Sequence, residues 1–392
     1  MTAVEATDGA ADDVVGEQQR DLADAVRSLL AKRSGSAEVR AACETERGYD
    51  EALWSTLCEQ IGVAGLAIPE EYGGAGAGPV EVHVVLEELG RALTPSPLLG
   101  SAVLAANAVL RSGDQQACER ILPGIAEGRS VAALAWCGPR GRWDPEQPAC
   151  VAAGDERPVL NGRACYVLDG AHADVLIVAA SVGSDVGIFE VDPEADGVHR
   201  WPETPMDPTR QLATIDLVDA PATPLTSSGG LEVLRRVRDL GCVALSAEQV
   251  GATAEALRRT VEHAQQRRQF GRPIGAFQAL KHRMAEAFVS SEAARSASYA
   301  AAFAAERAER AERAERAERA DPELDRSAAV AKVWCSEAFQ QVTAEMVQLH
   351  GGVAITWEHD AHLFFKRAHG SAQLLGQPAE HVDRLSAREG LV

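Results

Sequence analysis

"RRQFGRPIGAFQALKHR", residues 267–283, decides how the second half of this chain folds. The stretch lies between two long helical patterns and combines glycines, a proline and several positive charges. We expect Arg267 and Gln269 at the C-terminal end of the first helix, because Gly271 and Pro273 stop a helix. Gly275 then allows a tight turn, and "AFQALKHRMAEAFV" begins the next helix.

The chemistry of this turn leaves two interpretations open. A fixed arginine, a glutamine amide and exposed backbone N–H groups form a cradle for a diphosphate. Alternatively, the turn is a basic helix cap in which Arg267 only complements the helix dipole. The residues of the turn do not decide between the two.

Helical patterns flank the turn on both sides. Upstream, apolar residues recur at steps of three and four, which predicts an apolar seam on a long helix; they are Val250, Ala254, Leu257, Val261 and Ala264. Downstream, "AERAERAERAERAERADP" repeats every three residues, so its alanines spiral around a helix. Over residues 305–320 we therefore expect a solvated helical extension with Glu–Arg pairs four residues apart and no chemistry of its own.

The rest of the chain divides into a helical part and a β part. "RDLADAVRSLLAKR" and "VEVHVVLEELGRAL" have helical spacing, whereas the segment from about residue 130 to 229 consists of short apolar runs interrupted by Gly, Asp, Asn and Pro. These patterns predict an α+β multidomain protein. A helical domain spans residues 1–134, an antiparallel β-barrel or sandwich spans 135–228, and a four-helix bundle spans 229–392.

Composition excludes several classes of function. The formal net charge of −20 argues against nucleic-acid binding, which needs clustered Lys and Arg. The first residues, "MTAVEATDGAADD", lack the basic and apolar regions of a secretory signal. The sequence has no run of about 18 uncharged apolar residues, so we expect no membrane span. The 8 cysteines are scattered singly, which is typical of reduced thiols in a cytoplasmic protein.

Four segments together resemble the acyl-CoA dehydrogenase family. "RRQFGRPIGAFQ" resembles its R-x-Q-F-G-x-x-I-x-x-F-Q signature, and "QLHGGVAITWEHDAHLFFKRA" its later Q-x-x-G-G-x-G-x-T segment. "IPEEYGG" and "EELGRAL" are similar to motifs of the family's N-terminal helical domain. The resemblance covers nearly the whole chain, and it implies the same helical, β, helical order of domains.

The family binds FAD between subunits, so the resemblance implies where this chain contacts a flavin. Two loops match the segments that hold the pyrophosphate and adenosine end of a neighbouring subunit's FAD. The implied cofactor-binding residues are Arg267, Gln269, Phe270, Gln348, Gly351 and Gly352.

The glutamate that removes the substrate's α proton in this family has no counterpart here. In most members it precedes a glycine in an E-G-T tripeptide, but Leu375, Gly376 and Gln377 stand at the matching positions. A second lineage carries the glutamate on an earlier helix, where this chain has Gly241. Leucine and glycine cannot accept a proton, so we expect no catalytic residue in this chain.

Three other carboxylates remain as candidates for a displaced base: Asp239, Glu248 and Glu358. Asp239 is two residues from Gly241, which places it about 200° around a helix from that position. Catalytic groups tolerate little misplacement, so these carboxylates are weak substitutes.

The segments that hold the flavin ring in the family are also altered. Members carry T-E-P-x-x-G-S-D on one strand and W-x-T/S-N-G on a later one, whereas this chain has "WCGPRGRWD" and "YVLDG". Leu168 stands where a threonine or serine hydroxyl would bond the ring. The adenosine end of a flavin site is thus preserved and the ring end is not.

A cluster of histidines could suggest a metal site. His359, His362 and His369 lie close together, and H-x-x-H can be a metal pair. The spacing differs from H-E-x-x-H, and the stretch matches an ordinary C-terminal helix of the family, so we expect no metal.

The sequence predicts a subunit of an FAD-dependent acyl-CoA dehydrogenase in an α2β2 hetero-oligomer. A paralogous partner subunit would supply the base, the ring-binding groups and the acyl-CoA pocket. The resemblance is greatest to actinobacterial paired dehydrogenases of steroid side-chain CoA thioesters, with electron-transfer flavoprotein as acceptor. Two alternatives remain: a homotetramer that uses a displaced carboxylate, and a flavin-free structural paralogue.

Overall fold

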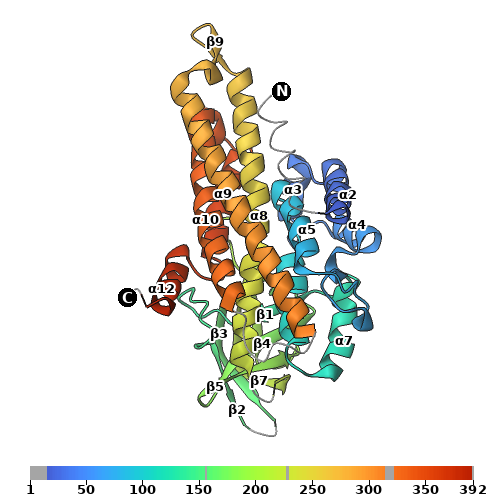
Figure 1. Ribbon diagram of the computed structural model, residues 1–392. Coiled ribbons are helices and arrows are strands. Elements are labelled where there is room, and N and C mark those ends of the chain that lie inside the picture. Colours follow the sequence, from blue (N-terminus) through green and yellow to red (C-terminus); the bar gives the residue numbers. More distant parts are fainter. Residues whose placement is uncertain (1–15, 155–156, 227–228, 314–321, 391–392) are drawn as a thin grey trace.

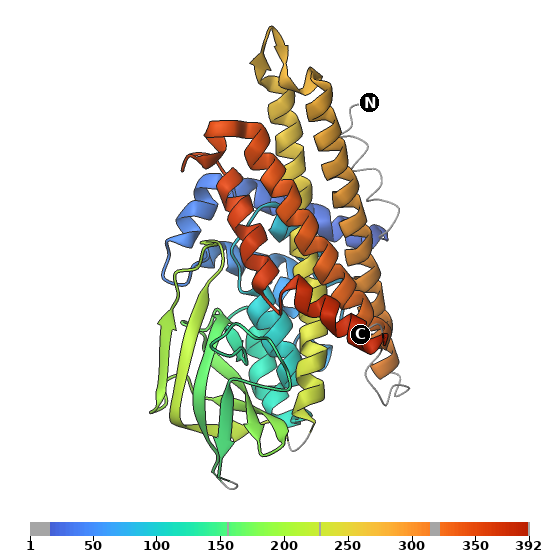
Figure 2. The same ribbon diagram turned by 90° about the vertical axis from the view of Figure 1, so that its left-hand side faces the viewer.

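The computed structural model describes residues 16–154, 157–226, 229–313 and 322–390. A bundle of long helices forms the axis of the molecule, with the N-terminal helices along its side (Figure 1). The β domain lies at the end of this axis opposite the hairpin of β8 (Arg268–Gln269) and β9 (Arg272–Pro273) (Figure 2). The order helical, β, helical expected from the sequence is therefore confirmed. No helix in the described part of the chain is both long and apolar enough to cross a membrane.

The N-terminal region consists of short and medium helices. They are α2 (Glu17–Arg33), α3 (Ser36–Cys43), α4 (Glu51–Ile61), η1 (Val63–Gly65), η2 (Glu70–Tyr72), α5 (Pro79–Arg91), η3 (Leu98–Ala105), α6 (Ala106–Leu110) and α7 (Gln115–Ala126). The segment η3 is a π-helix, and all eight of its residues are buried. The two helices expected from sequence periodicity correspond to α2 and α5.

The β domain is a closed barrel. Its strands are β1 (Ala132–Ala135), β2 (Cys150–Ala153), β3 (Val159–Leu168), β4 (Val175–Val182), β5 (Asp185–Val191), β6 (Val198–Pro202) and β7 (Leu212–Pro224). The pairings run β4–β2–β3–β7–β5, and pairing of β5 with β4 closes the ring around an apolar core. Two pairs, β1–β4 and β2–β4, are parallel rather than antiparallel. β1 spans the boundary expected at residues 134/135.

The C-terminal region is built on one very long helix. It contains α8 (Gly230–Gln266), α9 (Gln278–Arg313), α10 (Pro322–His350), α11 (Ala361–Gln373) and α12 (Pro378–Arg388). At about 1.5 Å per residue, the 37 residues of α8 extend about 55 Å. The helix passes close to α5 at Gly251. A methyl group at this position would collide with the backbone oxygen of Glu87. Glycine is needed there for the close approach.

The start of the A-E-R repeat differs from the solvated extension expected for residues 305–320. α9 continues to Arg313 with Ala305 and Ala308 fully buried, and residues 314–320 lie outside the described residues. A three-residue step drifts only about 60° per repeat around a helix. Over two repeats the alanines therefore still face the core.

Candidate functional site

The turn at residues 267–277 forms a small hairpin beyond the helix ends. Arg267 caps α8, with its N–H bonded to His263 O at 2.8 Å. Strands β8 (Arg268–Gln269) and β9 (Arg272–Pro273) then pair, with Phe270 and Gly271 both at positive φ between them. The sequence analysis expected Gln269 at the C-terminal end of the helix, but Gln269 lies on the hairpin, beyond the end of α8. The hairpin projects beyond α8 and α9 (Figure 1).

The other predicted cofactor-binding segment, residues 348–352, lies at the same end of the helical bundle as the hairpin. Gln348 lies in the last turn of α10, and Gly351 begins the 3-10 helix η5 (Gly351–Ile355). The rings of His263 on α8 and His350 on α10 are stacked, with centroids 4.1 Å apart and planes inclined by 27°. This contact joins the two segments that the sequence predicts to act together.

The predicted cofactor-binding residues face outward. Arg267, Gln269, Gln348 and the glycines are exposed, and Phe270 is 91% exposed. A methyl group built on Gly271, Gly351 or Gly352 would meet no heavy atom within 4 Å. Open glycine backbone beside an arginine and an exposed aromatic ring fits the nucleotide end of a large cofactor.

The two positions that carry the family's base lie against each other. A methyl group built on Gly241 would fall 2.8 Å from Leu375 Cδ1 and 2.6 Å from Leu104 Cδ2. Leu375 is 1% exposed and adopts φ of 60°, so its side chain is buried at this point. The place where a carboxylate is expected is therefore filled by two leucines.

Buried polar groups hold the loop that carries Leu375. Lys332 Nζ donates to Ser371 O at 3.1 Å and to Ala372 O at 2.9 Å, which caps the end of α11. His381 Nε2 donates to Leu375 O at 2.9 Å. Burial lowers the pKa of Lys332 to about 8. These hydrogen bonds hold the backbone on both sides of Leu374 in place, so the side chain of Leu375 stays buried.

The three candidate carboxylates have other surroundings in the folded chain. Asp239 is buried and bonds Arg238 at 2.8 Å, and Glu248 is buried against Arg210. Glu248 is two turns along α8 from Gly241, about 10 Å away on the helix axis. Glu358 is exposed in the turn before α11. Each carboxylate is paired with arginine, distant from the leucines, or in solvent.

Comparison with known proteins decides the family. Residues 16–129 match the description "Acyl-CoA dehydrogenase, N-terminal domain", and residues 228–388 match "Acyl-CoA dehydrogenase, C-terminal domain". Acyl-CoA dehydrogenase IpdE2 of Mycobacterium tuberculosis is 41% identical over 377 residues, which cover 95% of this chain and 97% of that protein. The chain belongs to the acyl-CoA dehydrogenase family.

Two solved acyl-CoA dehydrogenase complexes have the same fold. One is a variant of the Tcur3481–Tcur3483 steroid ACAD, with 29% identity, a TM-score of 0.84 and coverage of 96% of this chain and 99% of that chain. The other is the ChsE4–ChsE5 complex of Mycobacterium tuberculosis, with 28% identity, a TM-score of 0.86 and coverage of 96% and 98%.

FAD is the cofactor typical of acyl-CoA dehydrogenases, and this chain fits one end of it better than the other. At the ring end, Leu168 is buried and offers no hydroxyl, while Tyr166 is 42% exposed at positive φ. In "WCGPRGRWD" the indoles of Trp136 and Trp143 are buried against each other at 5.7 Å. At the positions that the sequence resemblance assigns to ring-binding hydroxyls, Trp143 and Leu168 are thus apolar and buried.

A buried charged network beside the ring end could not be foreseen from the sequence. Arg210, in the loop before β7, is paired with Glu248 of α8, and Arg367 of α11 lies 3.5 Å from Asp207. Burial raises the pKa of nearby Asp169 to about 7. Glu248 resembles an ordinary helix residue in the sequence. Its need for a partner is visible only in the folded chain, where α8 is buried on nearly all sides and a charge within it must be paired.

Proposed function

We propose that this chain is the non-catalytic subunit of a hetero-oligomeric FAD-dependent acyl-CoA dehydrogenase, with α2β2 composition. It grips the pyrophosphate and adenosine of the partner subunit's flavin through Arg267, Gln269, Phe270 and Gln348. The partner chain supplies the base, the ring-binding groups and the acyl pocket. The assembly introduces an α,β double bond into an acyl-CoA.

The observation that carries this proposal is the contact between Leu375 and Gly241. Removal of an α proton needs a carboxylate within hydrogen-bond reach of the substrate carbon. Both positions from which the family supplies it converge on one point, and that point is occupied by hydrocarbon. If this chain has no carboxylate at that point, a second subunit must supply the base for the reaction to occur.

The length of α8 supports a contribution in trans. Gly241 lies near the start of α8, and Arg267 caps its other end, about 40 Å away at about 1.5 Å per residue. A single flavin cannot reach from one to the other. The outward-facing cradle therefore suits a flavin whose ring belongs to another chain.

The residues of the cradle have separate tasks. The Arg267 guanidinium and the Gln269 amide donate hydrogen bonds to diphosphate oxygens, and Phe270 offers an aromatic face to the adenosine. Gly351 and Gly352 allow the nucleotide to approach the backbone of η5. The bound flavin supplies the hydride acceptor for the substrate's β carbon.

The relatives support the proposed partner and substrate classes. Of the two structures with 28–29% identity, one is the Tcur3481–Tcur3483 steroid ACAD variant and the other is the complex of ChsE4 with ChsE5. We propose a paralogous dehydrogenase subunit as partner, a steroid side-chain CoA thioester as substrate and electron-transfer flavoprotein as electron acceptor.

Co-purification tests this function. The chain is produced alone and together with a paralogous dehydrogenase subunit, and the visible spectrum and native mass of each product are recorded. A colourless lone chain and a tetramer with one FAD per pair of subunits support the proposal. A lone chain that is a yellow, active homotetramer favours a displaced base, and a colourless pair favours the flavin-free structural role.

A further inference from the structure

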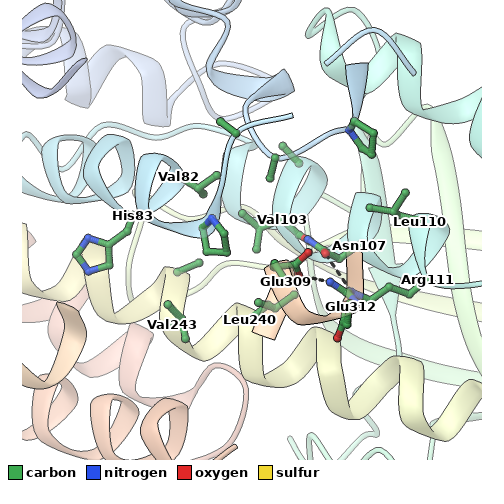
Figure 3. A pocket seen from close by; sticks show the side chains of 16 residues that line it. Val82, His83, Val103, Asn107, Leu110, Arg111, Leu240, Val243, Glu309 and Glu312 are labelled. Atoms are coloured by element: carbon green, nitrogen blue, oxygen red, sulfur yellow. Dashed lines mark hydrogen bonds and ion pairs between the residues drawn. The ribbon is translucent and has the colours of Figure 1, made fainter. Parts of the chain in front are cut away.

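A cavity of about 470 Å³ lies between α5, the η3–α6 helix, α8 and the end of α9 (Figure 3). Its volume falls in the range of small-molecule sites, about 300–1,000 Å³. The cavity is remote from the cofactor cradle, which lies at the far end of α8. No step of the proposed function uses it.

The walls of this cavity are mainly apolar. Val82, Val103, Leu110, Leu240 and Val243 line it, together with alanines and prolines of the loop at residues 67–79. An apolar space of this size holds water that makes few hydrogen bonds. Displacing such water with an apolar molecule is favourable.

The charged groups at one end of the cavity are already neutralised. Arg111 bonds both Glu309 and Glu312 of α9, the latter at 2.6 Å, and Glu312 also bonds Arg236 at 2.6 Å. Figure 3 shows His83 at the opposite end from this cluster. Burial lowers the pKa of His83 to about 3, so its ring is neutral at physiological pH.

The cavity is separate from the point that the family uses for chemistry. Leu104 of η3 points to Gly241. Val103, also in η3, and Asn107, in α6, line the cavity. The η3–α6 helix therefore contacts the Gly241–Leu375 position on one side and lines the cavity on another side. Ala102 and Val103 belong to the π-helical stretch, and π segments occur frequently at functional sites.

We propose that this cavity is a binding site for an uncharged, mainly apolar small molecule, with the end of α9 as its closing element. An anion such as a carboxylate or a CoA thioester would have to break the ion pairs of Arg111, and the apolar walls offer no replacement. A neutral molecule leaves these pairs intact. Glu309 and Glu312, through their ion pairs with Arg111, then hold the end of α9 over the cavity.

Two fluorescent probes of the same skeleton test the proposal on the full chain. N-phenyl-1-naphthylamine is neutral, and 8-anilinonaphthalene-1-sulfonate carries one negative charge. We expect saturable binding of the neutral probe and at least tenfold weaker binding of the sulfonate. Absence of saturable binding, or equal affinity for both probes, overturns the proposal.

Substitutions then locate the bound probe. Val103→Trp and Val243→Phe each fill the cavity and should weaken neutral-probe binding at least tenfold. The matched control Val182→Phe, at an exposed position of β4, should leave it unchanged. Val243→Phe serves if Val103→Trp fails to fold by circular dichroism. Unchanged affinity in a folded cavity variant overturns the site.

The closing role of α9 has its own readout. Glu309→Gln with Glu312→Gln removes the ion pairs to Arg111 without changing side-chain size. We expect stopped-flow uptake of the neutral probe to become at least threefold faster. An uptake rate equal to that of the unsubstituted chain overturns the closing role.

Discussion

His263 and His350 stack with ring centroids 4.1 Å apart, and this contact joins the ends of α8 and α10 that carry the proposed cofactor cradle. The ring of His359 contacts His350 in a tilted arrangement, with centroids 4.8 Å apart and planes inclined by 54°. Burial lowers the pKa of all three imidazoles, that of His350 to about 4, and each is close to another histidine or an arginine. The neutral form of each ring is therefore favoured at this end of the bundle, and protonation of His350 would oppose the stack.

The stack predicts a loss of stability in acid. The pKa of His350 is lower in the folded chain than the ordinary 6.5, so the unfolded state binds its proton first as the pH falls. The stabilisation is complete above pH 6.5 and is lost between about 6.5 and 4. At pH 5 we expect a cost of about 1–2 kcal/mol from this ring.

Thermal unfolding at pH 7 and pH 5 measures the effect. His350→Phe keeps an aromatic ring in the stack but removes the titrating group, so its Tm should fall less between the two pH values. His199→Phe, on the exposed face of β6, is the control. An identical pH dependence in His350→Phe and the unsubstituted chain would rule out this role.

Arg267→Ala should weaken flavin retention in the complex with the partner subunit. One lost charge-assisted hydrogen-bond donor costs about 1.5–3 kcal/mol, or roughly 10- to 100-fold in affinity. Arg268→Ala removes the adjacent exposed charge and serves as the control. The flavin content per pair after gel filtration is the measurement, and equal retention in the two variants contradicts the assignment.

The sequence predicted the turn between the two long helices well, because its signals are local. The glycines and proline of the 267–275 turn interrupt a regular apolar period, and Val250, Leu257 and Ala264 of the predicted seam are all buried. The adjacency of the 267–270 and 348–352 segments came from the family resemblance. In the folded chain, the stack of His263 on His350 accounts for it.

Other features depend on contacts between residues far apart in the chain. That Leu375 and Gly241 meet at one point depends on how the loop after α11 returns to α8. β6 has a pattern of exposed residues and no apolar alternation, so it could not be distinguished from a loop. The buried alanines of the A-E-R repeat depend on a neighbouring helix that covers them.

Lys332 should matter for stability although it is far from the cradle. Lys332→Met keeps most of the side-chain volume but leaves the Ser371 and Ala372 carbonyls without a donor in a buried place. We expect a loss of about 2–4 kcal/mol in the free energy of unfolding. Urea denaturation measures it, with the exposed Lys281→Met of α9 as the control. A loss as small as that of the control would show that Lys332 does not hold the loop.

Restoring the missing carboxylate should not create an enzyme. Leu375→Glu places an acid at the family's usual position, but the ring end still lacks the hydroxyl replaced by Leu168, and the new charge is buried among Leu104 and its neighbours. We expect a less stable lone chain with no dehydrogenase activity. Activity of this variant in the absence of a partner would show that its own ring site is functional.

Exchange of the substrate's α hydrogen in D₂O tests most directly whether this chain owns a proton acceptor. An acyl-CoA is incubated with the lone chain plus added FAD, or with the co-purified pair, and deuterium uptake is read by mass spectrometry. We predict uptake with the pair and none above the enzyme-free rate with the lone chain. Deuterium incorporation by the lone chain would contradict the assignment of this subunit as non-catalytic.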